Sequence, residues 1–230
     1  MQSNLAGSFD ALNTELVACR HCPRLVAWRE KVGIDRRAAF QDHTYWAKPA
    51  PNFGDPLARR LIVGLAPAAH GANRTGRMFT GDRSGDFLFA ALHRAGLANQ
   101  PHSVDSDDGL TLSGVIITAA VHCAPPDNKP TPEEFAACRR YLHRLIETRD
   151  WDAVLCLGGL AWHSTFEAFK TIGHTSGSRP AFGHGTVAKL PSGTSLFGSY
   201  HPSQQNTFTG RLTPAMLDQV LGSFMGRHDS

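Results

Sequence analysis

The sequence lacks any apolar run long enough to cross a bilayer, and residues 1–16 lack the basic stretch and apolar core of an export signal. We therefore expect a cytoplasmic protein with no membrane contact. An excess of one charge is also missing, because 23 Lys and Arg face 20 Asp and Glu, for a formal net charge of +3. Bulk charge thus gives little support to a nucleic-acid partner, and any such contact must come from a local surface.

Internal repeats and low-complexity tracts are absent as well, so the sequence gives no reason to divide the chain. Its 230 residues, 41% hydrophobic and 19% charged, have the composition of an ordinary globular protein. This length exceeds the usual size of one domain but suits a single α/β domain with a large core. We therefore expect one domain over residues 1–230.

Short apolar runs rich in Val, Ile or Leu predict four strands, at residues 61–66, 114–121, 153–157 and 195–200. Capping and periodicity signals predict a helix that begins near Ser84 and carries the apolar run 87–97, helices at residues 132–147 and 160–169, and a last helix opening at Thr213-Pro214. This alternation of strands and helices favours an α/β fold with a parallel sheet. Turn-forming residues predict surface loops at 41–59 and 99–109.

Five cysteines occur in a chain without an export signal, so metal-binding or buried-thiol roles are favoured over disulfides. Cys19 and Cys22 stand within one turn of each other, a spacing that lets both sulfurs reach one metal centre. Cys123 and Cys138 form a second pair that could converge on the first. Ligation by four cysteines fits a zinc ion as well as an iron–sulfur cluster. The alternative is that these cysteines bind no metal and are buried as small apolar residues. Cys156 lies inside a predicted strand, where we expect a core residue.

Residues 64–82 form a Gly-rich connection from the first strand to the next helix, at the sheet edge where ligands of open α/β sheets bind. Residues 71–78 resemble a phosphate-binding loop, but Arg77-Met78 stands where that motif requires Lys followed by Ser or Thr. A nucleoside triphosphate site is therefore not predicted. Phe79 is an aromatic residue in a loop that needs no apolar bulk, and it is suited to stacking on an unpaired base. The alternative is a connection without further function.

The polar segment 199–211 follows the fourth strand and opens at the same edge of the sheet. His201 is expected at the strand tip, facing the Gly-rich connection. A lone His at a strand end is often structural, whereas the small polar residues that follow this one suit contacts with phosphates and a nucleic-acid groove. Composition alone leaves both interpretations open.

Three segments together resemble the motifs of the family 5 uracil-DNA glycosylases: residues 64–82, Ala120-Val-His-Cys-Ala-Pro-Pro-Asp-Asn-Lys-Pro-Thr-Pro132, and residues 201–211. The resemblance covers most of the chain, from Cys19-Arg-His-Cys-Pro-Arg-Leu-Val-Ala-Trp28 to the last helix. It implies a three-layer α/β/α sandwich around a four-stranded parallel sheet. It also implies a 4Fe-4S cluster held by Cys19, Cys22, Cys123 and Cys138.

The resemblance also implies roles for single residues. Phe79 is similar to the platform on which a flipped uracil stacks, and Asn128 to the amide that reads the base edge. His201 resembles the histidine that stabilises charge on a uracil carbonyl oxygen, and Asp82 the carboxylate that assists the attacking water or the positive sugar. Each of two residues also has a structural alternative. Asn128 fits a turn, and Asp82 fits the cap of the helix that begins near Ser84.

Other residues are expected to contact the substrate. The backbone N–H groups of the first motif are candidates for binding the base, at Gly64, Leu65 and Ala66. Three polar residues are candidates for filling the vacated base stack: Gln204, Gln205 and Asn206. Three basic residues are candidates for phosphate contacts: Arg74, Lys129 and Arg211.

This sequence departs from related glycosylase families in two motifs. Those families place a carboxylate or amide in the first motif and another amide on the second strand. Here the positions are held by Leu65 or Ala66 and by Ala119 or Ala120. The usual water-activating side chain is thus missing, and a pocket with fewer polar groups suits a broad range of bases.

The resemblance implies a monofunctional hydrolase that flips uracil, hypoxanthine or another damaged base out of double-stranded DNA and cleaves the N-glycosidic bond, leaving an abasic site. Mispaired bases should be favoured, because they are easiest to extrude. We expect a monomer that works at the nucleoid. The alternative is a non-catalytic metal-cluster nucleic-acid-binding protein, which would have no use for Asp82. A small-molecule nucleotide enzyme is disfavoured because no complete phosphate-binding motif is present.

Overall fold

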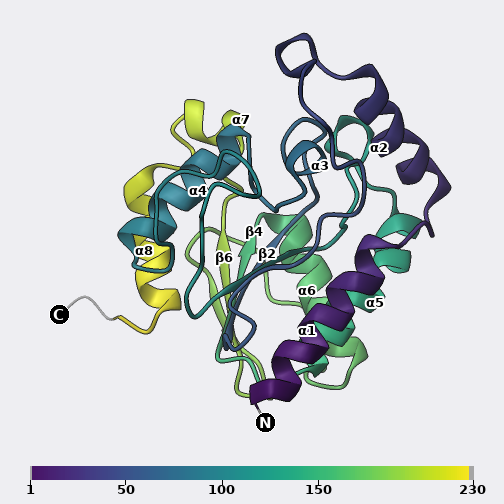
Figure 1. The fold of residues 1–230 in the computed structure, drawn as a ribbon. Helices are drawn as coiled ribbons and strands as arrows, with labels where there is room; N and C mark the ends of the chain where they lie inside the picture. Colours follow the sequence, from purple (N-terminus) through teal and green to yellow (C-terminus); the bar gives the residue numbers. More distant parts are fainter. Residues whose placement is uncertain (1, 228–230) are drawn as a thin grey trace.

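A six-stranded sheet with the order β1-β3-β2-β4-β6-β5 runs through the middle of the molecule (Figure 1). The computed structural model describes residues 2–227. The strands are β1 Phe53–Gly54, β2 Arg60–Gly64, β3 Ile116–Ala119, β4 Ala153–Leu157, β5 Val187–Lys189 and β6 Ser195–Ser199. The central four, β3, β2, β4 and β6, pair in parallel, and they are the four strands that the apolar runs predict.

The expected purely parallel four-stranded sheet is wrong, because two antiparallel edge strands extend it to a mixed sheet of six. β1 pairs with β3, inside the segment 41–59 that was predicted as a loop, and β5 pairs with β6. β1 is two residues long and β5 three, and both are partly or largely exposed. Strands this short contain no apolar run that a sequence could reveal. They are recognised only by their backbone hydrogen bonds to a longer neighbouring strand.

Eight α-helices and two short 3-10 helices are described in residues 2–227: α1 Gln2–Val17, α2 Pro23–Asp35, η1 Ala38–Phe40, α3 Ala72–Thr75, α4 Arg83–Arg94, η2 Pro126–Asn128, α5 Pro132–Glu147, α6 Gly159–Thr171, α7 Gln204–Phe208 and α8 Pro214–Phe224. The bounds of α5 are those that its sequence predicts. Thr131 and Glu134 form a capping box at its start, with Pro132 in the first turn.

Helices cover both faces of the sheet: α1, α5 and α6 lie on one side, and α4 and α8 on the other (Figure 1). Side chains alternate between these layers along each strand. Ile62 of β2 and its neighbours Ile117 and Leu155 pack in the cluster that includes Phe89 of α4. The next residue along β2, Leu61, packs in the cluster of α1, α5 and α6. Because both faces are covered, the central strands are continuously apolar rather than alternating.

The carboxyl ends of the parallel strands meet at one edge of the sheet, so the segments that follow them gather there. These segments are residues 65–82 after β2, 120–131 after β3 and 200–213 after β6. They are the three segments that carry the sequence motifs. Within residues 2–227, no helix has the length and apolar character needed to span a membrane.

Candidate functional site

A pocket opens at this edge of the sheet, with a volume of about 1480 Å³ counted out to its mouth. Apart from the three candidate phosphate contacts, ten residues were predicted to act on or bind the substrate, and the lining includes nine of them: Gly64, Leu65, Ala66, Phe79, Asp82, Asn128, His201, Gln204 and Gln205. Asn206 is not part of the lining. Residues from three connections, far apart in the sequence, thus face one space.

Phe79 is held against the end of β2 by glycines. A Cβ atom on Gly64 would come within 2.8 Å of the Phe79 ring, and one on Gly85 within 1.8 Å of the Phe79 carbonyl oxygen. Phe79 itself has a φ of +54°, in the left-handed region that non-glycine residues rarely occupy. Its ring centroid lies 6.0 Å from that of His201, with 32° between the ring planes. The ring is therefore fixed in the pocket next to the histidine.

A buried polar network holds the segment on either side of Phe79. The Arg77 guanidinium donates to the Asp108 carboxylate at 2.7 Å, to Ser103 Oγ at 3.1 Å and to Thr80 Oγ1 at 2.9 Å. Burial acts to raise the pKa of Asp108, but hydrogen bonds from Arg77 and from two backbone N–H groups outweigh it and hold that pKa well below its usual range. We call these four residues, Arg77, Thr80, Ser103 and Asp108, the Arg77 clamp.

Asp82 lies where it can serve both of the roles that the sequence leaves open. Its carboxylate caps α4, since Oδ1 accepts a hydrogen bond from the Gly85 backbone N–H at 2.9 Å, and the same side chain lines the pocket. Burial raises the pKa of Asp82, against the lowering effect of the N–H groups of Gly85 and Ser84. Gly71 gives the carboxylate its room, because a Cβ there would come within 2.2 Å of Asp82 Oδ2.

His201 lies just past the end of β6 and lines the pocket. Burial lowers the pKa of His201 to about 4, so its imidazole is neutral at physiological pH. A neutral imidazole can donate one hydrogen bond to a substrate oxygen without carrying a charge of its own. The backbone oxygen of His201 accepts a hydrogen bond from Asn206 Nδ2 at 2.8 Å. Asn206 thus turns its amide toward the His201 backbone, and the structure does not bring that residue into the pocket lining.

Asn128 follows Asp127 at the mouth of the pocket, and both residues have positive φ angles, +56° and +53°. Together with Phe79, they account for three of the five non-glycine residues with positive φ among those described. Backbone strain of this kind costs about 1–3 kcal/mol per residue and gathers at functional sites. Asn128 is in the turn that the alternative interpretation expects, and its exposed side chain also lines the pocket.

The side of the pocket nearest the sheet is apolar where related families carry polar groups. Leu65, Ala66 and Ala119 are all part of the lining. The polar side chains come from the loops and from α7 instead.

The three candidate phosphate contacts differ in their exposure. Lys129 and Arg211 are exposed, whereas Arg74 is buried. The Arg74 guanidinium donates to the Gly81 backbone oxygen and stacks on the Phe40 ring at 4.2 Å, so its predicted contact with phosphate is wrong. Phe208, an apolar residue of the same polar segment, is 74% exposed on α7, and sequence analysis assigned it no role.

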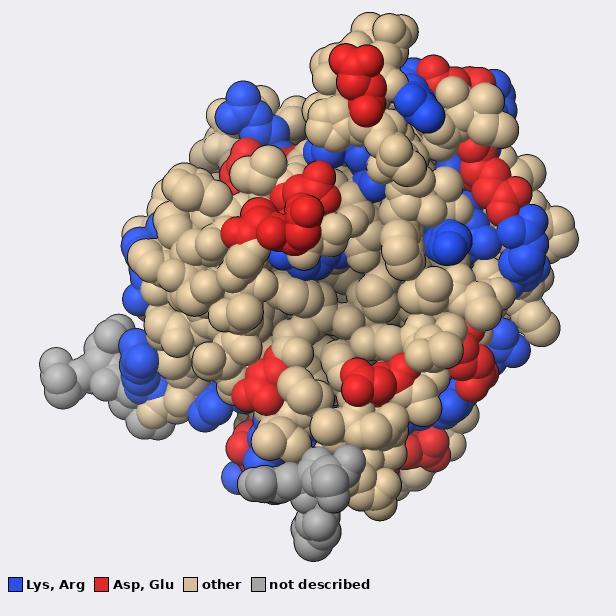
Figure 2. Space-filling view, viewed as in Figure 1, with Lys and Arg blue, Asp and Glu red and all other residues tan. Residues whose placement is uncertain are grey.

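Charged side chains are interspersed on the face shown in Figure 2, and the middle of this face is largely uncharged. This distribution agrees with the small net charge of +3. Among the described residues that line the pocket, Arg83 is the one Lys or Arg side chain.

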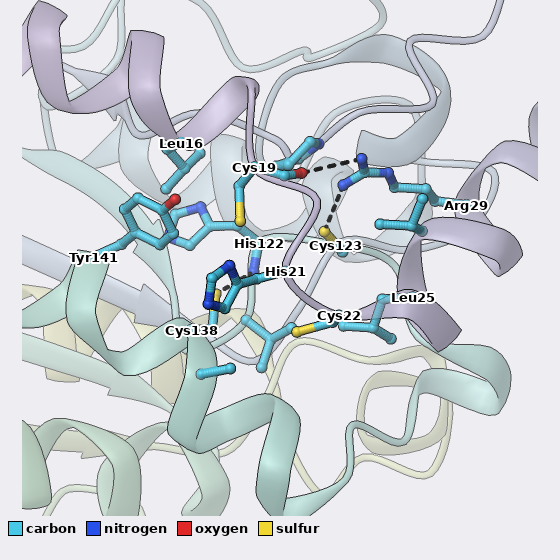
Figure 3. Close-up of a pocket in the computed structure, with 14 residues that line it drawn as sticks. Leu16, Cys19, His21, Cys22, Leu25, Arg29, His122, Cys123, Cys138 and Tyr141 are labelled. Atoms are coloured by element: carbon cyan, nitrogen blue, oxygen red, sulfur yellow. Dashed lines mark hydrogen bonds between the residues drawn. The ribbon is translucent and has the colours of Figure 1, made fainter.

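The four predicted metal ligands converge on a second cavity, of about 360 Å³ counted out to its opening, between α2, α5 and the segment after β3. In Figure 3, the sulfur atoms of Cys19, Cys22, Cys123 and Cys138 surround a common space. Cys156 lies in the core with no exposed surface, as predicted.

Hydrogen-bond donors contact three of these four sulfurs. Arg29 Nη1 lies 2.9 Å from Cys123 Sγ, the His122 backbone N–H 3.4 Å from Cys138 Sγ, and Arg140 Nη2 3.6 Å from Cys19 Sγ. Burial raises the pKa of the Cys123 thiol to about 11 and that of the Cys138 thiol to about 12. Such thiols stay protonated at neutral pH unless a cationic centre binds the thiolates.

Within residues 2–227, no three Cys, His, Asp or Glu side chains meet closely enough to hold one metal ion. An iron–sulfur core with several irons separates its cysteine sulfurs more widely than a single ion does, because each sulfur binds a different iron. The donor set of four cysteines around one cavity therefore fits such a core.

Comparison with known proteins places the chain in a group of DNA-repair enzymes. Residues 51–224 match the family model of the uracil DNA glycosylase superfamily. The chain is 55% identical to the type-5 uracil-DNA glycosylase of Mycobacterium tuberculosis over 94% of this chain and 80% of the relative. It is 54% identical to that of Mycobacterium leprae over 96% of both chains, and 53% identical to that of Thermus thermophilus over 92% of this chain and 94% of the relative.

Proposed function

Since the chain belongs to the uracil DNA glycosylase superfamily and is a hydrolase that removes uracil from DNA, we propose that its pocket receives a uracil flipped out of double-stranded DNA. The observation that carries this assignment is the convergence of Phe79, Asp82, Asn128 and His201, from three separate connections, around one open pocket. Phe79 stacks on the base, and the Asn128 amide pairs with its edge. The whole chain, residues 1–230, acts as one glycosylase domain.

The reaction breaks the bond between the sugar C1′ atom and uracil N1, and the electron pair of that bond goes to the base. Negative charge then develops on a uracil carbonyl oxygen, to which the neutral His201 imidazole donates a hydrogen bond. Positive charge develops on the sugar, which the Asp82 carboxylate stabilises. Water attacks C1′ and gives up a proton to Asp82 or to solvent, which leaves an abasic site. The departed uracil anion takes up a proton from solvent and becomes free uracil.

Apolar residues at the motif positions support a broad substrate range. Leu65, Ala66 and Ala119 offer no fixed hydrogen-bond pattern, and unpaired polar groups are what reject near-isosteric ligands most strongly. We therefore propose that hypoxanthine and other deaminated or damaged bases are also removed. We further propose that the protein acts as a monomer at the nucleoid, in the cytoplasm.

Single-turnover release of uracil from a synthetic duplex tests the roles of Asp82 and His201. Asp82→Asn keeps a residue that caps helices well but removes the negative charge, and His201→Gln removes the imidazole. Each variant should lower the rate on the order of a hundredfold, the usual effect of removing one preorganised electrostatic group. Asp86→Asn, exposed in the first turn of the same helix, is the matched control and should leave the rate unchanged. Wild-type rates in both Asp82→Asn and His201→Gln, with the fold intact, would refute the assignment.

We also propose that Cys19, Cys22, Cys123 and Cys138 hold a 4Fe-4S cluster. The cavity they share and the donors aimed at their sulfurs support this. When bound, the cluster would cross-link the α1–α2 segment to the rest of the fold. It would also supply a centre for electron transfer. The chain's own residues provide four thiolates and the hydrogen bonds that stabilise them.

Metal and sulfide analysis tests the cysteine centre. The purified protein should contain about four iron atoms and four sulfides per chain. Cys138→Ala should lose most of this iron, whereas the core variant Cys156→Ala should retain it. Stoichiometric zinc in place of iron, or full iron content in Cys138→Ala, would contradict the proposal.

A further inference from the structure

Arg29 of α2 is a buried cation without a carboxylate partner. Its relative exposure is 1%. Nη2 donates to the Cys19 backbone oxygen at 3.2 Å and Nη1 contacts Cys123 Sγ at 2.9 Å, while Nε has no hydrogen-bond partner within residues 2–227. None of the ion pairs found in that part of the chain involves Arg29, and its neighbour Glu30 pairs with Arg20 instead. A guanidinium stays protonated in proteins, so a full positive charge is buried here.

An unpaired buried charge is costly, so a counter-charge is expected close by. The groups nearest the guanidinium are a backbone oxygen and a cysteine sulfur (Figure 3). A neutral thiol cannot balance the charge, but a thiolate can. The buried cation thus points to negative charge in the cysteine cavity.

Arg140 of α5, which does not line the cavity, provides the contrast at another of the four sulfurs. Its Nη2 atom lies 3.6 Å from Cys19 Sγ and 3.0 Å from the Tyr141 hydroxyl, but its contact with the sulfur is exposed to solvent. Water and salt screen an exposed charge, whereas a buried one acts through a medium of low dielectric constant. Of the two arginines at the sulfurs, Arg29 should have by far the larger electrostatic effect.

We propose that Arg29 is the counter-cation of the four-cysteine centre and that it sets the reduction potential of the bound cluster and its resistance to oxidative loss. This inference rests on the proposed 4Fe-4S assignment. Four thiolates bring more negative charge than the iron–sulfur core brings positive charge, so the assembled centre is anionic. Arg29 is then a positioning and tuning residue, which acts on the centre and does not touch the DNA substrate.

The sign of the effect follows from charge. Adding an electron makes the centre more negative, and a nearby cation favours the more negative state, which raises the reduction potential. Removal of the Arg29 charge should therefore shift the potential to more negative values and make the centre easier to oxidise. Hydrogen bonds to the sulfurs and local charge are recognised controls of cluster potentials.

The test compares four forms of the full chain purified without oxygen: wild type, Arg29→Gln, Arg29→Lys and Arg140→Gln. For each, iron and sulfide content, the midpoint potential by voltammetry, and the rate at which the cluster absorbance bleaches in air are measured. Arg29→Gln should have a more negative potential and bleach at least fivefold faster than wild type. Arg29→Lys keeps the charge and should recover most of the wild-type behaviour. Arg140→Gln should bleach within twofold of wild type.

The outcomes separate the two proposals. Absence of iron and sulfide from the wild type would overturn the cluster assignment itself. An iron-loaded wild type with Arg29→Gln unchanged in potential and bleaching would overturn the role of Arg29 alone. If Arg29→Gln does not fold with its iron, Arg29→Lys decides between the two explanations. Iron retained in Arg29→Lys supports the role of the charge. Iron lost equally from both variants shows that the packing of the guanidinium matters instead, and overturns the proposal.

Discussion

At the scale of single residues, burial influences the charge of the two catalytic candidates, Asp82 and His201, which line the same pocket. Burial disfavours the charged form of each, so it raises the pKa of Asp82 and lowers that of His201. The helix cap that Asp82 makes opposes this, because the Gly85 and Ser84 N–H groups favour the anion. Above both pKa values the result is one anion and one neutral hydrogen-bond donor, the combination that the proposed mechanism requires.

The pH dependence of the single-turnover rate should report these two groups. Asp82 must be ionised, so the rate should fall with decreasing pH as Asp82 takes up its proton, at a pH above the usual titration range of an aspartate. His201 should add a second protonation near pH 4. Because its pKa is lowered, His201 stays neutral above that value and should cause no loss of rate between pH 5 and 8. The measurement is a rate profile from pH 4 to 8, and Asp82→Asn should abolish the upper step. Persistence of that step in Asp82→Asn would assign it to another group.

At the scale of elements, the Arg77 clamp joins two loops that have no regular structure of their own. The segment around Phe79 gains its rigidity from loop 99–109, through the Asp108 carboxylate and Ser103. The Gly81 backbone N–H also donates to the Ser103 oxygen, at 2.9 Å. A strained Phe79 backbone can persist only where its surroundings hold it in place. The acidic loop is therefore part of the pocket's framework.

Arg77→Met should destabilise the fold and slow the reaction together. It leaves the partly buried Asp108 carboxylate, whose side chain is 15% exposed, without its cation, and breaking such a pair costs up to about 3–5 kcal/mol. Arg94→Met is the matched control, because the Arg94–Asp218 pair is exposed and should cost at most about 1 kcal/mol. Urea unfolding and single-turnover rates measure both effects. Equal stability losses in the two variants would show that the Arg77 pair is no stronger than a surface one.

The sequence predicts the central elements well because they carry dense local signals. β4 and α5 have the expected bounds, since a run of five apolar residues and a capping box each mark their own ends. α1 and α2 were not predicted, because their amphipathic pattern is weak and their partners lie far along the chain. The positions of Arg29 and Arg77 could not be predicted either, because the segments that bury them lie far along the chain. Only the fold shows that both arginines are buried.

At the scale of the whole molecule, interspersed charge limits how the protein can hold DNA. Basic contacts near the pocket should come from a few exposed residues, among them Lys129 and Arg211. Phosphate contacts make affinity depend on salt and are indifferent to sequence. The protein should therefore search duplex DNA weakly and hold it firmly only where a base has entered the pocket.

Binding to uracil-free duplex should weaken with rising salt concentration. Lys129→Ala and Arg211→Ala should each reduce the slope of log affinity against log salt by about one. Arg94→Ala, whose side chain is paired with Asp218, should leave the slope unchanged. Fluorescence anisotropy over a range of salt concentrations gives these slopes. An affinity that does not vary between low and physiological salt would count against phosphate-driven binding.

The packing of α1 has a consequence for the order in which the chain matures during synthesis. Its apolar residues Phe9, Leu12 and Leu16 pack against α5, which follows more than a hundred residues later. Cys19 and Cys22 likewise share a cavity with Cys123 and Cys138, which follow about a hundred residues later. During synthesis, α1 therefore emerges with an apolar face whose contacts with α5 form only after more than a hundred further residues have been translated. The final packing of α1 therefore comes after α5 has been translated.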